Sequence, residues 1–407
     1  MKFILLFFSG IVLHLGITPV QALLHRFEVR SSSHTRLCTT KSMLTVNGRF
    51  PGPTIYARRG DLVTVDIINL SDQNITIHWH GVKMPRYPWS DGTDYVTHDW
   101  SRNSVHGAIV ILPPKRETYP FPKPHAHVPI IIEEWWNSKV ETIYEKFVSS
   151  GTDPDPSNAF LINGQPGDLY PCSKQDTYKL RVEFGKRYLI KLVNTALNSI
   201  MFFKIGNHNF TVVGADGAYM KPIQTDYAAI APGQTLDLLL EANQPPGRYY
   251  MAARIYASAT TIYSVTIPAT AIIEYVGNHA PPLLPSFPEV NDSAASIGFT
   301  DKLKSLGNNA DVPKRVDETF FYTLPVNAMP CTTCTNSTRL FSSVNNVTML
   351  LPTATDILEA YYRGINGVYT TDFPDFPPSS FNYAYIRYNA AGREWDPIRN
   401  RRSCIGV

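Results

Sequence analysis

His78 and His80 are the residues of this chain whose type and spacing point most directly to chemistry. They lie in the segment 75–81 (ITIHWHG), which follows a run of alternating apolar residues at 62–70. If the segment is a strand, side chains alternate across the sheet, so the two histidines share one face and Trp79 packs on the other. Neutral imidazole binds copper, zinc and iron, so the pair predicts a metal site. Two surface histidines on an edge strand are the alternative.

Motifs around the pair resemble those of plant laccases, which are multicopper oxidases. Residues 46–55 (VNGRFPGPTI) and 76–82 (TIHWHGV) together resemble the family's first copper motif. Other motifs follow in the family's order, up to about residue 383: 88–92 (PWSDG), 105–112 (VHGAIVIL), 120–125 (PFPKPH), 133–136 (EEWW), 161–167 (LINGQPG) and 367–374 (GVYTTDFP). The resemblance implies tandem cupredoxin-like β-sandwiches with copper as cofactor. It also implies one-electron oxidation of phenols, such as lignin precursors or lignin-derived phenols, coupled to reduction of dioxygen to water.

The ligand set that this resemblance implies is incomplete. An intact member binds four coppers through four histidine-rich motifs, two in the first domain and two in the last, and only the pair at His78 and His80 is present here. The first domain's second motif is missing at an internal gap near 97–98, where His98 is either a remnant ligand or a loop histidine. The His-Cys-His motif of the blue copper is absent as well, since none of the five cysteines has a histidine beside it. We therefore expect at most one weak copper site.

The remaining histidines and the carboxylates suggest no second site. His125 and His127 have the letters of the missing motif but lie in the region that follows 120–124 (PFPKP). We expect His106 to be a packed strand residue and His208 a turn residue. No pair of acidic residues has a spacing that singles out a general acid and a general base.

The elements that must position the pair are β-strands. Short alternating runs separated by Gly and Pro predict an all-β chain of tandem Greek-key sandwiches. A repeat supports this organisation, because 60–69 parallels 185–194 with a glycine and an asparagine at the same spacing. The repeat places Phe203 and Ile205 where the first copy has its histidines, so the second copy is expected to be copper-free. Its expected strands are 177–183, 188–192, 201–205, 236–241 and 249–254, with a hairpin turn at 214–217.

Four segments follow from these patterns. We expect a secretory signal peptide at 1–22, a first cupredoxin-like domain at 23–148, a second at 149–285, and a linker with an incomplete third domain at 286–407. The linker is proline-rich at 281–288, and the third unit begins near 318–324 and continues through 348–351. An incomplete sandwich leaves sheet edges uncovered, so self-association through this unit or through Cys404 is expected. The tail 399–407 does not resemble the family, which fits a truncated or alternatively spliced member.

Several features agree with export. Six acceptor sequons for N-glycans begin at Asn69, Asn74, Asn209, Asn291, Asn336 and Asn346. A secreted chain favours disulfides, and we expect Cys38 and Cys172 to join the first two domains. Cys331 and Cys334 form a short-loop disulfide or pair separately. The net charge is +3, and the sequence has no long basic block and no membrane-length apolar run after the signal peptide, so neither nucleic acid nor a membrane is an expected partner.

The sequence therefore predicts a laccase-family copper protein secreted to the extracellular space or apoplast. Its expected partners are phenolic small molecules and dioxygen, and its oxidase activity is expected to be impaired or lost. The alternative is a non-catalytic laccase-like glycoprotein that binds little copper or modulates partners.

Overall fold

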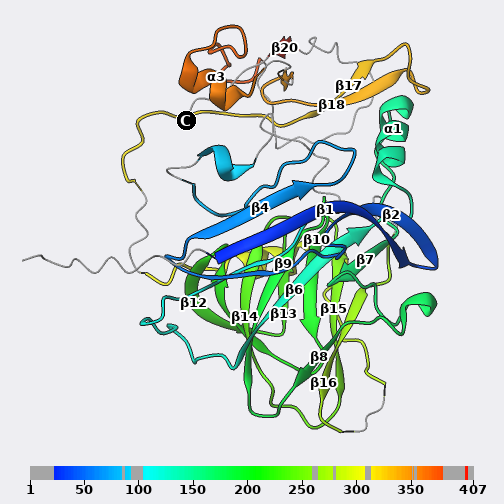
Figure 1. The fold of residues 1–407 in the computed structure, drawn as a ribbon, viewed down its shortest axis with the longest axis vertical. Helices are drawn as coiled ribbons and strands as arrows, with labels where there is room; N and C mark the ends of the chain where they lie inside the picture. The colour runs from blue at the N-terminus through cyan, green and yellow to red at the C-terminus, as the bar shows by residue number, and fades with distance from the viewer. Residues whose placement is uncertain are drawn as a thin grey trace, which may run out of the picture.

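A computed structural model describes residues 23–84, 88–92, 104–258, 265–277, 281–307, 313–350, 352, 355–378 and 399–401. Strands dominate these residues, as predicted (Figure 1). The expected signal peptide at 1–22, His98 and Cys404 lie outside the described residues. Within the described part of the chain, none of the helices is long and apolar enough to cross a membrane.

The second unit is a sandwich of two sheets. Its six-stranded sheet has the order β12-β11-β14-β9-β6-β7, and its five-stranded sheet has the order β13-β10-β15-β16-β8. The six-stranded sheet consists of β6 (Ala126–Trp135), β7 (Ala159–Ile162), β9 (Arg187–Asn194), β11 (Phe210–Ala215), β12 (Ala218–Thr225) and β14 (Thr235–Glu241). The five-stranded sheet consists of β8 (Lys179–Val182), β10 (Ile200–Ile205), β13 (Tyr227–Ile230), β15 (Arg248–Tyr256) and β16 (Ala269–Tyr275). Phe202, Phe203 and Phe210 are fully buried in the main core cluster of this unit.

The five strands expected in this unit are confirmed as β8, β9, β10, β14 and β15. The expected hairpin turn joins β11 to β12, where Asp216 and Gly217 have φ of 46° and 75°. Positive φ at both central residues is the geometry of the type I′ turn, which matches the twist of paired strands. Phe203 and Ile205, which occupy the histidine positions of the repeat, are both buried in the core.

The expected boundary at 148/149 differs from the observed hydrogen bonding. Strand β6 pairs in parallel with β9, from Ala126 opposite Tyr188 to Ile132 opposite Asn194. The strand therefore belongs to the sheet of the second unit, although we expected it in the first. Parallel pairing between segments so distant in sequence leaves no local signal in the alternation of residues.

The first unit has two small sheets. The three-stranded sheet has the order β2-β1-β4, formed by β1 (Leu23–Arg36), β2 (Thr39–Val46) and β4 (Val63–Asn69). A parallel pair joins β3 (Ile55–Arg58) to β5 (Ile109–Leu112). The buried cluster of this unit contains Phe27, Val29, Val46 and Ile55.

The first and second units are held together by covalent and polar contacts. Cys38 and Cys172, the latter within the 3₁₀ helix η4 (Pro171–Ser173), form a disulfide. His106 Nε2 lies 2.6 Å from Oε1 of Glu133, a buried residue of β6 whose other carboxylate oxygen accepts the Gly164 amide hydrogen. His106 is packed as expected, but it lies before β5 and not within a strand. These contacts place the first unit on one end of the second sandwich.

In Figure 1 the third unit lies on the side of the first unit that faces away from the second sandwich. Helix α2 (Ser293–Thr300) covers the second sandwich through Phe299, and the third unit contains β17 (Val326–Pro330), β18 (Thr338–Ser342), β19 (Val347–Met349), α3 (Ile357–Arg363) and β20 (Arg399–Arg401). Residues 318–324, where we expected this unit to begin, are not in a strand.

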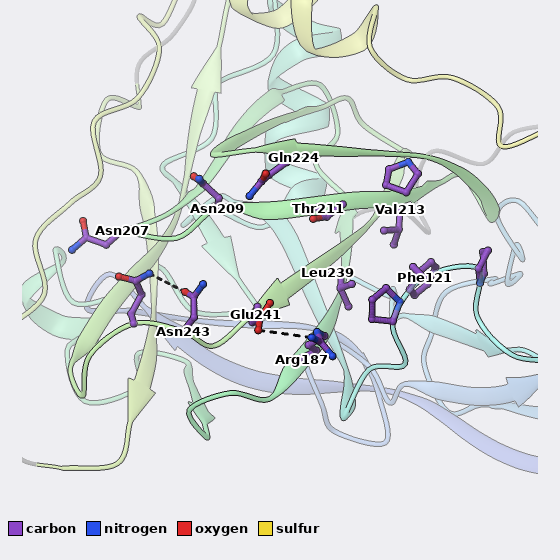
Figure 2. Close-up of a pocket in the computed structure, with 14 residues that line it drawn as sticks. Phe121, Arg187, Asn207, Asn209, Thr211, Val213, Gln224, Leu239, Glu241 and Asn243 are labelled. Atoms are coloured by element: carbon purple, nitrogen blue, oxygen red, sulfur yellow. Dashed lines mark hydrogen bonds and ion pairs between the residues drawn. The ribbon is translucent and has the colours of Figure 1, made fainter.

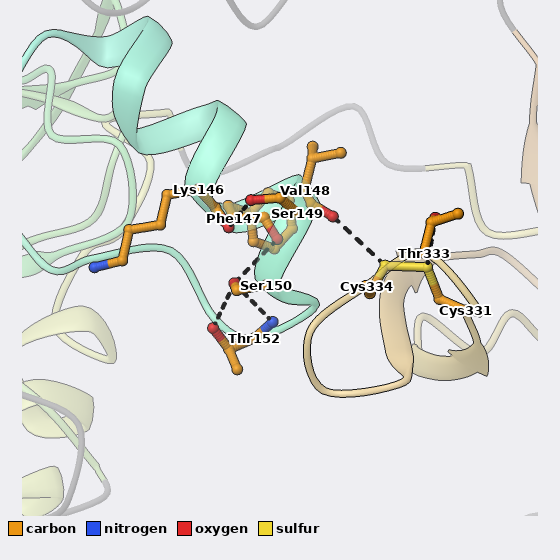
Figure 3. The surroundings of a disulfide bond; sticks show 9 residues. All are labelled: Lys146, Phe147, Val148, Ser149, Ser150, Thr152, Cys331, Thr333 and Cys334. Carbon is orange, nitrogen blue, oxygen red and sulfur yellow. Dashed lines mark hydrogen bonds between the residues drawn. A yellow bond between two sulfur atoms is a disulfide. The ribbon is translucent and has the colours of Figure 1, made fainter.

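The loop between β17 and β18 contains a second disulfide and contacts helix α1 (Val140–Ser150), as Figure 3 shows. It joins Cys331 to Cys334, and Cys334 Sγ lies 3.7 Å from the carbonyl oxygen of Val148. The amide of Thr335 donates to the Ser149 carbonyl at 3.1 Å. The short loop therefore closes over the C-terminal end of α1.

Candidate metal centre

His78 and His80 point to the same side of their segment. Their ring centroids are 5.6 Å apart with an angle of 84° between the ring planes. Ile75 and Trp79 pack against the buried cluster of the first unit, so the predicted alternation is correct. The predicted strand is wrong, because residues 74–79 are irregular. A strand needs a neighbour for its backbone hydrogen bonds, and β4 pairs only with β1 among the described strands.

The orientation of His78 is fixed by the 3₁₀ helix η1 (Pro88–Asp91). Its Nδ1–H donates to the Asp91 carbonyl oxygen at 2.8 Å, and the Asp91 carboxylate lies 3.5 Å from the same nitrogen. Donation from Nδ1 fixes the tautomer in which Nε2 carries the free lone pair, the usual outer contact of a metal-binding imidazole. Sequence reasoning missed the role of Asp91, although its motif had been recognised.

Gly92 allows this contact to form. Thr76 Oγ1 donates to the Gly92 carbonyl oxygen at 2.8 Å. Gly92 has φ of 76°, and a Cβ at this position would lie 1.7 Å from the Ile77 carbonyl oxygen. Only glycine therefore lets η1 approach the histidine segment so closely.

His80 approaches the second unit. It is exposed in the turn after Trp79, and a Cβ built on Gly233 would lie 3.3 Å from its Nε2. Gly233 lies in the loop between β13 and β14 and has φ of 80°. A side chain here would crowd the imidazole, a constraint that only the three-dimensional contact reveals.

A cavity of about 510 Å³ lies beside this pair, between η1 and α3. Asp91 belongs both to its wall and to the contact with His78. Trp89, which lines the cavity, meets Tyr362 of α3 edge to face, with ring centroids 5.3 Å apart. The cavity is therefore linked to His78 through Asp91, and neither imidazole lines it.

The donors around the pair do not make a complete metal site. No group of three or more His, Cys, Asp and Glu side chains is placed to hold a metal ion within the described residues. Cys38, Cys172, Cys331 and Cys334 are bound in disulfides and offer no thiolate. Two imidazoles can bind one ion with the rest of its coordination sphere supplied by water.

Three other described histidines, His125, His127 and His208, have structural contacts. His127 Nε2 lies 2.9 Å from the Tyr119 hydroxyl oxygen, and burial lowers the pKa of this imidazole. His208 follows a turn as expected, bonded through Nδ1 to the Gly206 carbonyl oxygen and through Nε2 to the Tyr275 hydroxyl, and burial lowers its pKa too. His125 stacks edge to face on Tyr188. These contacts supply no second metal site.

Comparison with known proteins agrees with the family resemblance of the sequence motifs. Two multicopper oxidase family models match the chain, at residues 28–114 and 126–278. The chain is 41% identical to Laccase-14 of Arabidopsis thaliana, over 93% of its own length and 73% of the relative's. It is 42% identical to Putative laccase-9 of Oryza sativa subsp. japonica, over 91% of its own length and 73% of the relative's.

The chain belongs to the plant laccase family of multicopper oxidases. Its fold resembles that of Fet3p, a multicopper oxidase that functions in iron import, with a TM-score of 0.67 and 17% identity over 82% of this chain and 65% of that one. The predicted all-β, cupredoxin-like fold is thereby confirmed. Copper is the cofactor of this family, but His78 and His80 alone do not fit the family's ligand set for a blue copper or a three-copper cluster.

Proposed function

We propose that this 407-residue polypeptide is a secreted laccase-type glycoprotein that binds at most one copper, weakly, at His78 and His80. The family oxidises phenols by single electrons and reduces dioxygen to water. In this polypeptide that activity on lignin precursors or lignin-derived phenols is lost or strongly impaired. What remains is a scaffold that binds little copper or modulates partners.

The proposed loss of oxidase activity rests on the cysteines, since none is placed to bind a blue copper. A blue copper takes electrons from a phenol through a Cys thiolate and two imidazoles. Four of the five cysteines are in disulfides, and Cys404 stands between Ser403 and Ile405, with no adjacent histidine. Full reduction of dioxygen needs four electrons, which the family stores on four coppers. A polypeptide with one histidine pair has no place for that store.

Secretion to the apoplast is supported by the glycan acceptor sites. Five of the six sequon asparagines are exposed, namely Asn69, Asn74, Asn209, Asn291 and Asn336, while Asn346 is partly buried. Attachment of a glycan at the exposed positions requires no change in the fold. Partial burial makes Asn346 the poorest of the six acceptors.

We also propose that two copies of this chain associate through the third unit. Large apolar side chains of the third unit are exposed, with Leu324 at 78% and Val326 at 67%. These residues flank the start of β17, an edge of a two-stranded sheet. Exposed apolar side chains beside an open edge favour pairing with a second chain.

Oxygen consumption tests the proposed loss of oxidase activity. The secreted protein is loaded with copper and supplied with a simple phenol, beside an intact plant laccase as positive control. We expect turnover at least about a thousandfold below the control, since removal of an essential catalytic group commonly costs that much. Rapid oxygen uptake that disappears in the double variant His78→Ala/His80→Ala would show that the proposed inactivity is wrong.

A further inference from the structure

A groove of about 470 Å³ crosses the outer face of the six-stranded sheet, and neither His78 nor His80 lines it (Figure 2). Its floor is apolar, with Val213 on β11 and Leu239 on β14. Phe121 and its flanking prolines Pro120 and Pro122 form one wall. A volume of this size lies in the range of roughly 300–1,000 Å³ that small ligands occupy.

Strand register places the polar residues of the groove in rows on the same face. Thr211 on β11 lies opposite Gln224 on β12 and Leu239 on β14. Arg187 on β9 lies opposite Glu241 on β14, with their charged groups 3.9 Å apart. The alternate residues of these strands point into the core, so this row faces solvent.

Carboxamides dominate the rim of the groove. Five side-chain amides line it, namely Asn207, Asn209, Gln224, Asn243 and Gln244. Asn243 and Gln244 bond to each other, whereas Asn207, Asn209 and Gln224 have no side-chain hydrogen bond to another described residue. A carboxamide offers two donors and one acceptor, which match the paired hydroxyl groups of a sugar. The ring of Phe121 offers an apolar surface to the C–H face of the same sugar.

One of these amides is also an acceptor for a glycan. Asn209, Phe210 and Thr211 form an N-glycosylation sequon. Asn209 is exposed and lines the groove, as does Thr211, while Phe210 is buried beneath them in the core. A sugar attached to Asn209 Nδ2 therefore begins inside the groove.

We infer that the groove is a carbohydrate-binding site whose occupant is the N-glycan of Asn209. Its first N-acetylglucosamine residues lie over Leu239, against Phe121, and bond to Asn207, Gln224 and Asn243. A covalent tether supplies an effective concentration in the millimolar range, so individually weak contacts suffice to hold the sugar. This occupancy requires the secreted, glycosylated state proposed above but no copper.

Site-resolved deglycosylation of the folded protein tests this occupancy. The full chain is secreted from a host that attaches high-mannose glycans and is then treated with endoglycosidase H, and mass spectrometry follows glycan release at each sequon. We expect release at Asn209 to be roughly thirtyfold slower than at the exposed Asn291, the factor that two net hydrogen bonds supply. After denaturation the two sites should be cleaved at the same rate.

Variants of the groove separate its contacts from general stability. Phe121→Ala and Gln224→Ala should each accelerate release at Asn209 at least about threefold and leave Asn291 unchanged, as one lost contact predicts. Gln175→Ala, which removes an exposed amide outside the groove, should change neither rate.

Three results would overturn the assignment. These are an empty Asn209 sequon beside occupied ones, release at Asn209 as fast as at Asn291 in the folded protein, and tight binding of soluble cellohexaose to an Asn209→Gln variant. The last would make an external polysaccharide the occupant. Absence of glycan from every sequon would instead contradict the proposed secretion.

Discussion

The asparagine that closes each copy of the internal repeat supports the most detailed prediction. Asn194 is fully buried, and its Nδ2 donates to the carbonyl oxygens of Ser199 at 3.0 Å and Ile230 at 2.9 Å, while its Oδ1 accepts the Ala196 amide hydrogen at 2.9 Å. Asn69 makes similar bonds in the first copy, since its Nδ2 donates to the Gln73 carbonyl oxygen and its Oδ1 accepts the Ser71 amide hydrogen, but this side chain is exposed. The substitution Asn194→Ala removes all three bonds where water cannot replace them.

The magnitude follows from these contacts. Three hydrogen bonds contribute about 1 kcal/mol each, so Asn194→Ala should lower the free energy of unfolding by about 3–4 kcal/mol. For a unit of this size that is a fall in melting temperature of about 10 °C. Asn69→Ala loses bonds that water replaces, so we expect less than about 1 kcal/mol and at most about 3 °C.

Calorimetry of the parent chain and the two variants, all produced in a bacterium that attaches no N-glycan, measures the difference, because Asn69 also belongs to a sequon. Equal shifts for Asn194→Ala and Asn69→Ala would show that burial of the side chain does not determine the loss of stability. A shift below about 2 °C for Asn194→Ala would refute the prediction as well, since it would mean that the buried bonds contribute less than one net hydrogen bond.

Three further predictions concern the site, pH and the disulfides. Gly92→Ala should weaken copper binding about 10–100-fold by displacing Asp91 from His78. Gly81→Ala is the control, because Gly81 has nearly the same left-handed backbone, with φ of 78° against 76°, but its Cβ would meet nothing within 4 Å. Competition titration with a copper chelator compares the two variants, and equal affinities would contradict the role of η1. Burial lowers the pKa of His208 below its usual 6.5, so the unfolded state binds the proton more readily and the free energy of unfolding falls as pH drops below about 6.5. His208→Gln should make this fall smaller, as measured by urea titrations at pH 7.5 and pH 5. An unchanged difference between the two pH values would argue against the role of His208. Loss of the Cys38 disulfide, which spans 134 residues, should lower the free energy of unfolding by about 5 kcal/mol, and loss of the Cys334 disulfide, which spans 3, by about 2 kcal/mol. Urea unfolding of the Cys38→Ala and Cys334→Ala variants measures both losses. The reverse order would contradict the explanation by chain entropy.

Alternation of apolar residues predicted the strands of the second unit because both of its sheets bury one face in a common core. Phe203 and Ile205 show this directly, since the repeat placed them in a strand and the structure buries them. The turn at Asp216 and Gly217 was predictable because few residues adopt positive φ without strain. These signals are local, so a single sequence contains them.

Contacts between distant segments could not be predicted in the same way. The parallel pairing of β6 with β9 moved 126–135 into the second unit, and no local pattern encodes that choice of partner. The segment 75–79 alternates like a strand but has no partner strand in the described part of the chain. Alternation records which face is buried, as Trp79 shows, and it does not record whether a neighbour completes the ladder.

In the candidate site too, local signals located the two histidines, whereas contacts between distant segments determine what surrounds them. The type and spacing of His78 and His80 located the pair and its common face. Asp91 and Gly233 contact the pair only because η1 and the loop between β13 and β14 fold against it. Residues that orient a ligand through backbone atoms, as the Asp91 carbonyl does, leave no signature in side-chain chemistry.

The number of coppers bound per chain shows whether His78 and His80 form the only copper site, as we propose. The secreted protein is dialysed and its copper measured by elemental analysis, beside the double variant His78→Ala/His80→Ala. We predict between zero and one copper per chain, and any stoichiometric copper should be absent from the variant. About four coppers per chain would contradict the proposal of at most one copper site, because four coppers would require ligands beyond this pair or sites shared between chains.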